Sequence, residues 1–151
     1  MPIPTGFVAN SSGYYTRGDG AAPFTFDGTS MAFQGSGPIS CFASGNVANA
    51  VAAATIPATP GKLSYITGFE VSGAGATAGS VVLCTVAGLL GGTLTYNVTV
   101  PAGALIGLTP LQVAFTRPVP ASAINTAITV SVPALGVGST NAAVVLRGFS
   151  L

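Results

Sequence analysis

A strict alternation of apolar and polar residues runs through residues 93–100. Leu94, Tyr96, Val98 and Val100 fall on one side, and threonine or asparagine occupies every position between them. Successive side chains of a β-strand point to opposite faces, so this period of two predicts a strand with one buried and one solvent-facing side. The pattern constrains the fold strongly, because a helix built from it would have no continuous apolar face.

The segment before this strand predicts its hairpin partner. Residues 81–87 read Val-Val-Leu-Cys-Thr-Val-Ala, which is apolar on both faces, as in a strand that is covered on both sides. Gly91 and Gly92 separate the two runs, and both can adopt the positive φ angles that tight β-turns require. We therefore expect a β-hairpin here.

Other strand-like runs flank this hairpin. In residues 63–71, alternation predicts that Leu63, Tyr65, Thr67, Phe69 and Val71 share one face. Shorter runs cover 111–115, 124–132 and 142–151, whereas the alanine-rich 47–56 predicts either a weak strand or a short helix. Short strands at this spacing, with no convincing helix, favour an all-β fold: a β-sandwich or jelly-roll domain over residues 46–151.

Residues 1–45 differ from the rest of the chain. They are rich in Gly, Ser and Pro, and aromatic residues recur between the glycines without a helical or sustained strand period. This composition predicts an extended N-terminal arm with anchoring contacts rather than a flexible linker, which would lack the aromatics. The candidates for contact with a partner are Phe7, Tyr14, Tyr15, Arg17, Phe24 and Phe26.

The chain has very few groups that carry acid–base or metal chemistry. It contains four Lys or Arg, three Asp or Glu and no His, so a Ser-His-Asp or Cys-His site cannot be built within one chain. Asp19 and Asp27 suit turn capping, and Glu70 suits a surface or interface ion pair. Two cysteines without histidine cannot hold tetrahedral zinc, although Ca²⁺ shared between subunits stays open. We expect a protein that is not an enzyme and has no catalytic residue, metal or cofactor.

The near-neutral net charge of the chain indicates which kinds of partner it can bind. A net charge of +1 predicts no binding to nucleic acid, and little like-charge repulsion opposes self-association. We expect much of the surface to lie inside a homo-oligomer or against a large partner; the alternative is a monomer coated in Ser, Thr, Asn and Gly. The most hydrophobic window, residues 81–100, is too often interrupted by Gly, Thr and Asn to predict a membrane helix.

The cysteines and the first residues of the chain indicate the cellular compartment in which the protein is made. The first residues show no basic region followed by an apolar run, so no secretory signal is expected. Synthesis in a reducing cytoplasm then predicts Cys41 and Cys84 as buried free thiols, with one Cys41–Cys84 bridge left open as the alternative.

Several motifs of residues 62–151 resemble the β-sandwich head-decoration, or cement, proteins of tailed bacteriophages. The motifs are Leu-Ser-Tyr-Ile-Thr-Gly-Phe at 63–69, Gly-Leu-Leu-Gly-Gly-Thr-Leu-Thr-Tyr at 88–96, Phe-Thr-Arg-Pro-Val-Pro-Ala at 115–121 and Arg-Gly-Phe-Ser-Leu at 147–151. The resemblance implies a homotrimer on the capsid surface of the virion, made in the host cytoplasm. It would bind the major capsid protein and bridge neighbouring capsid subunits against the pressure of packaged DNA.

Two other functions remain open. A receptor- or glycan-binding head of a phage fibre would share a trimeric β-sandwich, and labelling of tail tips rather than heads would identify it. A shell-forming coat protein would close into particles when expressed alone, whereas a decoration protein would stop at small oligomers.

Overall fold

The computed structural model describes residues 7–9, 15–17, 24–26, 31–33 and 39–151. The chain divides into two compact units, Met1–Gly37 and Pro38–Leu151. The sequence prediction placed the division after residue 45. Residues 40–43 form a strand that pairs within the second unit, which is why the structural division comes earlier.

The first unit contains four strands of three residues each: β1 (Phe7–Ala9), β2 (Tyr15–Arg17), β3 (Phe24–Phe26) and β4 (Met31–Phe33). Each pairs antiparallel with the next, in the order β1-β2-β3-β4. The sequence predicted an extended arm without strands of this kind, because three residues are too few to show a period of two.

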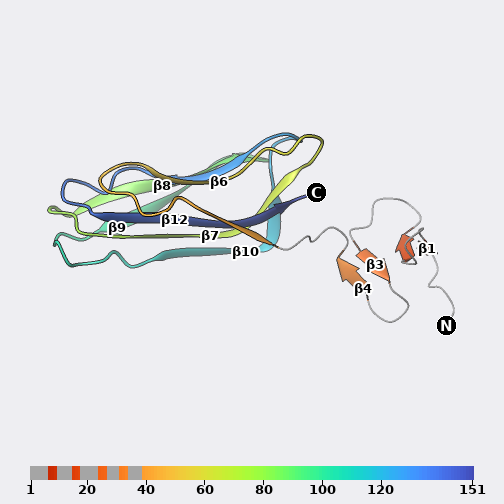
Figure 1. The fold of residues 1–151 in the computed structure, drawn as a ribbon, viewed down its shortest axis with the longest axis horizontal. Helices are drawn as coiled ribbons and strands as arrows, with labels where there is room; N and C mark the ends of the chain where they lie inside the picture. Colours follow the sequence, from red (N-terminus) through yellow and green to blue (C-terminus); the bar gives the residue numbers. More distant parts are fainter. Residues whose placement is uncertain (1–6, 10–14, 18–23, 27–30, 34–38) are drawn as a thin grey trace. The chain divides into compact units, whose positions relative to one another are not determined.

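The second unit is a sandwich of two antiparallel four-stranded sheets, as predicted, and no helix occurs in its described residues (Figure 1). The β12 sheet has the order β10-β7-β12-β5, and the β8 sheet has the order β6-β11-β8-β9. The strands of the β12 sheet are β5 (Ser40–Ala43), β7 (Ser64–Ala74), β10 (Leu111–Pro120) and β12 (Asn141–Ser150). Those of the β8 sheet are β6 (Ala52–Ile56), β8 (Ser80–Leu89), β9 (Gly92–Val100) and β11 (Ile128–Val132).

The chain changes sheet at every connection from β5 to β12 except one. The exception is the predicted β8–β9 hairpin, which is confirmed: Leu89 pairs with Gly92, and Gly91 and Gly92 have φ angles of 98° and 107°. A side chain at either turn position would be strained by these angles. Residues 52–56 are a strand rather than the alternative short helix.

The core lies between the two sheets and is almost entirely aliphatic. Alternate residues of β6, β11 and β12 point into it, following the burial pattern that a half-covered strand produces. The largest fully buried side chains are Phe69, Ile56, Ile66, Ile128, Leu135 and Leu146. Their burial supplies the main stabilisation of the unit.

A β-bulge corrects the predicted alternation in β7. The register between β7 and β12 shifts so that Arg147 pairs with Gly68 while Gly148 pairs with Ile66, which leaves Thr67 as an extra residue. Ile66 and Phe69 therefore both point into the core, and the predicted shared face of residues 63–71 is broken. The Thr67 hydroxyl donates to the Arg147 carbonyl oxygen across the bulge (3.1 Å).

Candidate interaction surface

Within residues 39–151, the charged side chains form no cluster suited to catalysis or metal binding. The Glu70 carboxylate lies 4.0 Å from the Arg147 guanidinium at the surface, which confirms Glu70 as a member of a surface ion pair. Lys62 and Arg117 are exposed. No group of three or more His, Cys, Asp or Glu side chains able to hold a metal ion occurs among the described residues. Partly exposed pairs such as Glu70–Arg147 contribute about 1 kcal/mol or less.

The two cysteines are free thiols in different environments. Cys84 is fully buried in β8, and burial raises the pKa of its thiol to about 11. Cys41 lies in β5 and is exposed, so the prediction that both thiols are buried is wrong for Cys41. The reason is that β5 is the edge strand of its sheet, and Cys41 pairs with the outward-facing Arg147.

The outer face of the β8 sheet is the most distinctive surface of the sandwich. Val81 and Leu83 point outward from β8 and are 63% and 51% exposed. The prediction that β8 is covered on both sides is therefore wrong within residues 39–151, where the β8 sheet has a packing partner on its inner side only. The outward residues, called the β8 outer face below, are Ala53, Thr55, Val81, Leu83, Thr85, Ala87, Thr93, Thr95, Asn97, Thr99, Thr129 and Ser131.

Cross-strand hydroxyl pairs satisfy part of the polar surface of the β8 outer face. The hydroxyls of Thr85 and Ser131 are 2.9 Å apart across β8 and β11, and those of Thr55 and Thr129 are 2.9 Å apart across β6 and β11. Removing water from a hydroxyl that already has a hydrogen-bond partner costs less free energy than removing it from an unpaired hydroxyl. These pairs therefore lower the cost of burying the face.

Charge is distributed unequally between the two sheets. The four strands of the β8 sheet contain no Asp, Glu, Lys or Arg. Glu70, Arg117 and Arg147 lie in strands of the β12 sheet, and Lys62 precedes β7. Taking a charge out of water costs several kcal/mol unless it is paired well. The β8 outer face is thus the large sheet surface that a partner can cover without burying charge.

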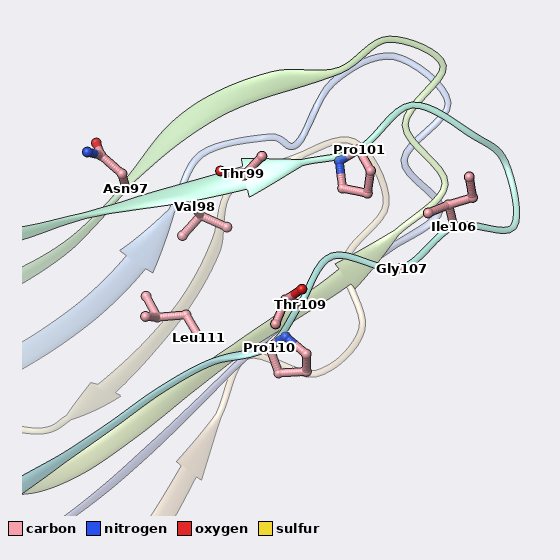
Figure 2. A pocket seen from close by; sticks show the side chains of 9 residues that line it. All are labelled: Asn97, Val98, Thr99, Pro101, Ile106, Gly107, Thr109, Pro110 and Leu111. Carbon is pink, nitrogen blue, oxygen red and sulfur yellow. The ribbon is translucent and has the colours of Figure 1, made fainter.

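A groove of about 570 Å³ lies between the edge strands β9 and β10 of the two sheets (Figure 2). β9 is the edge strand of the β8 sheet and β10 is the edge strand of the β12 sheet. Val98 of β9 and Leu111 of β10 point into the space between the strands, and Ile106 lies on the loop that joins them. Thr109 adds a polar side chain to the lining, whereas Asn97 and Thr99 border the groove with side chains on the other side of β9. Uncharged polar and apolar side chains together suit a neutral ligand.

The contact residues predicted from the sequence fall in the first unit. Phe7, Tyr15, Arg17, Phe24 and Phe26 have backbones in β1, β2 and β3, but their side chains lie outside the described part of the structure. Tyr14 lies wholly outside the described residues, and so do Asp19 and Asp27. Sequence reasoning missed the β8 outer face, although the alternating threonines of 93–99 already marked its β9 row.

Comparisons with known proteins do not add to the picture drawn from the geometry. Among the described residues, no helix is long and apolar enough to cross a membrane. No protein-family model, no curated protein and no solved structure matches the chain.

Proposed function

We propose that this protein is a non-enzymatic structural component of a bacteriophage virion, a capsid decoration protein. It binds the outer surface of the head as a homotrimer, contacts the major capsid protein and stabilises the contacts between capsid subunits. This function would not require a cofactor, nucleic-acid binding or membrane insertion.

The observation that carries the proposal is the uncharged β8 outer face with its exposed Val81 and Leu83. A β-sandwich with a wide, charge-free sheet suits permanent assembly, because permanent interfaces are more apolar than the ordinary surface. The resemblance of residues 62–151 to phage decoration proteins supports the head as the place of assembly.

The test uses particles of the phage that encodes the chain. We expect the protein on heads in a fixed ratio to the capsid protein and retained through mild washing. Heads assembled without it should release DNA at a lower temperature, and adding the purified protein back should restore the normal release temperature. Loss of the protein on very mild washing, with unchanged thermal release of DNA, would contradict the proposal.

The groove between β9 and β10 favours a second candidate, a receptor- or glycan-binding head of a phage fibre. Its lining combines Thr109 with Pro101, Pro110 and Ile106, a mixture able to hydrogen-bond and pack against a neutral sugar. Immunogold labelling separates the two functions: a decoration protein labels heads, and a fibre head labels tail tips.

A further inference from the structure

We propose that the edge of β9 binds an extended segment of a partner protein, which pairs with β9 as an additional strand of the β8 sheet. The inference rests on the proposed function for the identity of the partner, so the segment belongs to the major capsid protein. That the occupant is a strand follows from the β9 backbone, because an extended chain is what matches a row of N–H and C=O groups at a sheet edge.

The edge of β9 is the least protected of the four sheet edges of the sandwich. Within residues 39–151, β9 pairs with β8 alone, so alternate residues turn their backbone N–H and C=O groups away from the sheet. β9 is nine residues long and contains no proline and no charged residue. Its register with β8 is unbroken from Leu94 to Val100. A long, regular and uncharged edge of this kind accepts a further strand.

The other three edges of the sandwich have features that oppose strand addition. β10 contains Pro118, Pro120 and the exposed Arg117, and its register with β7 shifts between Ala114 and Val119. β5 and β6 are only four and five residues long. Prolines, charges, bulges and short edge strands are the means by which β-sheet proteins prevent pairing between edges. The edge of β9 has none of these features over residues 94–100.

The interior of the sandwich is partly open beside this edge. Leu94 pairs with the buried Val86 and therefore faces inward, yet it is 39% exposed. Leu111 and Phe115 of β10 pack against the core and are only half-buried. The groove lies between these two strands, with Val98 and Leu111 pointing into it (Figure 2). A strand added to β9 places alternate side chains on this inner side and so buries apolar surface that the two sheets leave exposed.

The same geometry argues for a segment of a different protein. A β9 strand of a second copy already sends Tyr96 and Val98 into its own core, so these side chains are not available to fill the groove. The described strands of the first unit are three residues long and pair with one another, so each is too short to match the nine residues of β9. The residues that line the groove carry no charge. The segment is therefore uncharged, with apolar residues at alternate positions.

Hydrogen exchange tests the backbone pairing directly. Heads that lack the protein are loaded with the purified full chain, and mass spectrometry compares amide exchange of the bound and free protein. We expect exchange in 94–100 to slow by about tenfold or more on heads, because the outward N–H groups of β9 become hydrogen-bonded. Exchange in β6, the other edge strand of the same sheet, should change far less.

Two matched pairs of variants test the groove side of the edge. Leu94→Asp and Ile106→Asp place a charge where the added strand buries it. The controls are Leu90→Asp in the β8–β9 turn and Leu105→Asp beside Ile106, at exposed leucines outside the groove. All four side chains are exposed, so the sandwich should fold in each variant, and urea unfolding checks this. We expect the first pair to bind heads about a hundredfold more weakly and the controls to bind like the unmodified protein.

The inference and the proposed function fail in different ways. If the protein is retained on heads but its β9 amides exchange as fast as in the free chain, strand addition is wrong and the proposed function stands. Equal head binding by the groove variants and their controls has the same meaning. A protein that is not retained on heads contradicts the proposed function and overturns the inference with it.

Discussion

The rings of Phe69 in β7 and Tyr96 in β9 meet edge to face, with centroids 5.3 Å apart and ring planes at 68°. β7 belongs to the β12 sheet and β9 to the β8 sheet, so this contact joins the two layers of the sandwich. Phe115 of β10 lies beside the same ring, with a centroid distance of 6.5 Å to Phe69. The three aromatic rings therefore form one cluster beside the edge strands β9 and β10.

Removing the Phe69 ring should destabilise the sandwich strongly. Phe69 is 1% exposed, so Phe69→Ala leaves a cavity and should lower the free energy of unfolding by about 3–5 kcal/mol. Urea unfolding followed by circular dichroism measures the loss, and Phe69→Leu serves if the alanine variant does not fold. Tyr96→Phe keeps its ring and should cost less than about 1 kcal/mol. If Phe69→Ala lowered the free energy of unfolding as little as Tyr96→Phe, the Phe69 ring would not be a main contributor to the stability of the core.

Gly88 should tolerate no side chain, whereas Gly61 should tolerate one at a modest cost. Both have positive φ, 87° and 73°. A Cβ at Gly88 would overlap the Ala127 carbonyl oxygen, while a Cβ at Gly61 meets nothing within 4 Å. Gly61→Ala should therefore cost only the backbone strain of about 1 kcal/mol, and Gly88→Ala should cost clearly more. Thermal unfolding of the pair measures the difference, and equal losses would show that the strand connection at 121–127 moves aside freely.

The two thiols should differ sharply in reactivity. Thiolates react with disulfide reagents and thiols do not, so the exposed Cys41 should react in the folded protein near neutral pH while the buried Cys84 does not. A colorimetric assay should find one reactive thiol in the native protein and two after unfolding in urea. In Cys41→Ser, the native signal should disappear. A native signal that persists in that variant would mean that Cys84 is accessible.

The raised pKa of Cys84 predicts a loss of stability at alkaline pH. The thiol has a pKa of 9.0 when unfolded and about 11 when folded, because burial disfavours the thiolate. Its contribution is fully present below pH 9 and is lost as pH rises toward 11, because only the unfolded state releases the proton over that range. The loss amounts to about 1 kcal/mol at about pH 10.

Urea unfolding across this pH range measures the effect, with Cys84→Ala as the control. The two proteins differ only at residue 84, so the difference between their two slopes of stability against pH belongs to Cys84. Parallel slopes would show that the thiol ionises equally easily in the folded and unfolded states.

Local patterns predicted the one hairpin of the sandwich and its strands other than β5, which fell within the predicted arm, with 47–56 left as either a strand or a short helix. Alternation in 93–100 and the two glycines before it are properties of neighbouring residues, so they can be seen without knowing what packs where. The bulge at Thr67 could not be seen in this way. It arises because β7 pairs with β12, about eighty residues later in the chain, and the register between them shifts.

The candidate interaction surface was predicted only in part. The threonine row of β9 was expected to face solvent, and it does. Val81 and Leu83 were expected to be covered, because an apolar residue in a strand shows that it suits burial but does not show what buries it. Within residues 39–151 nothing covers them, and these exposed apolar side chains mark the β8 outer face.

The sequence by itself determined that the chain forms short strands and carries almost no charge, since both depend on residue type and spacing alone. Only the tertiary structure decided which face of each strand meets the other sheet. That choice depends on crossovers between layers, which bring together residues far apart in the chain. It placed Glu70, Arg117 and Arg147 in one sheet and left the other sheet neutral, because successive strands other than β8 and β9 lie in opposite sheets.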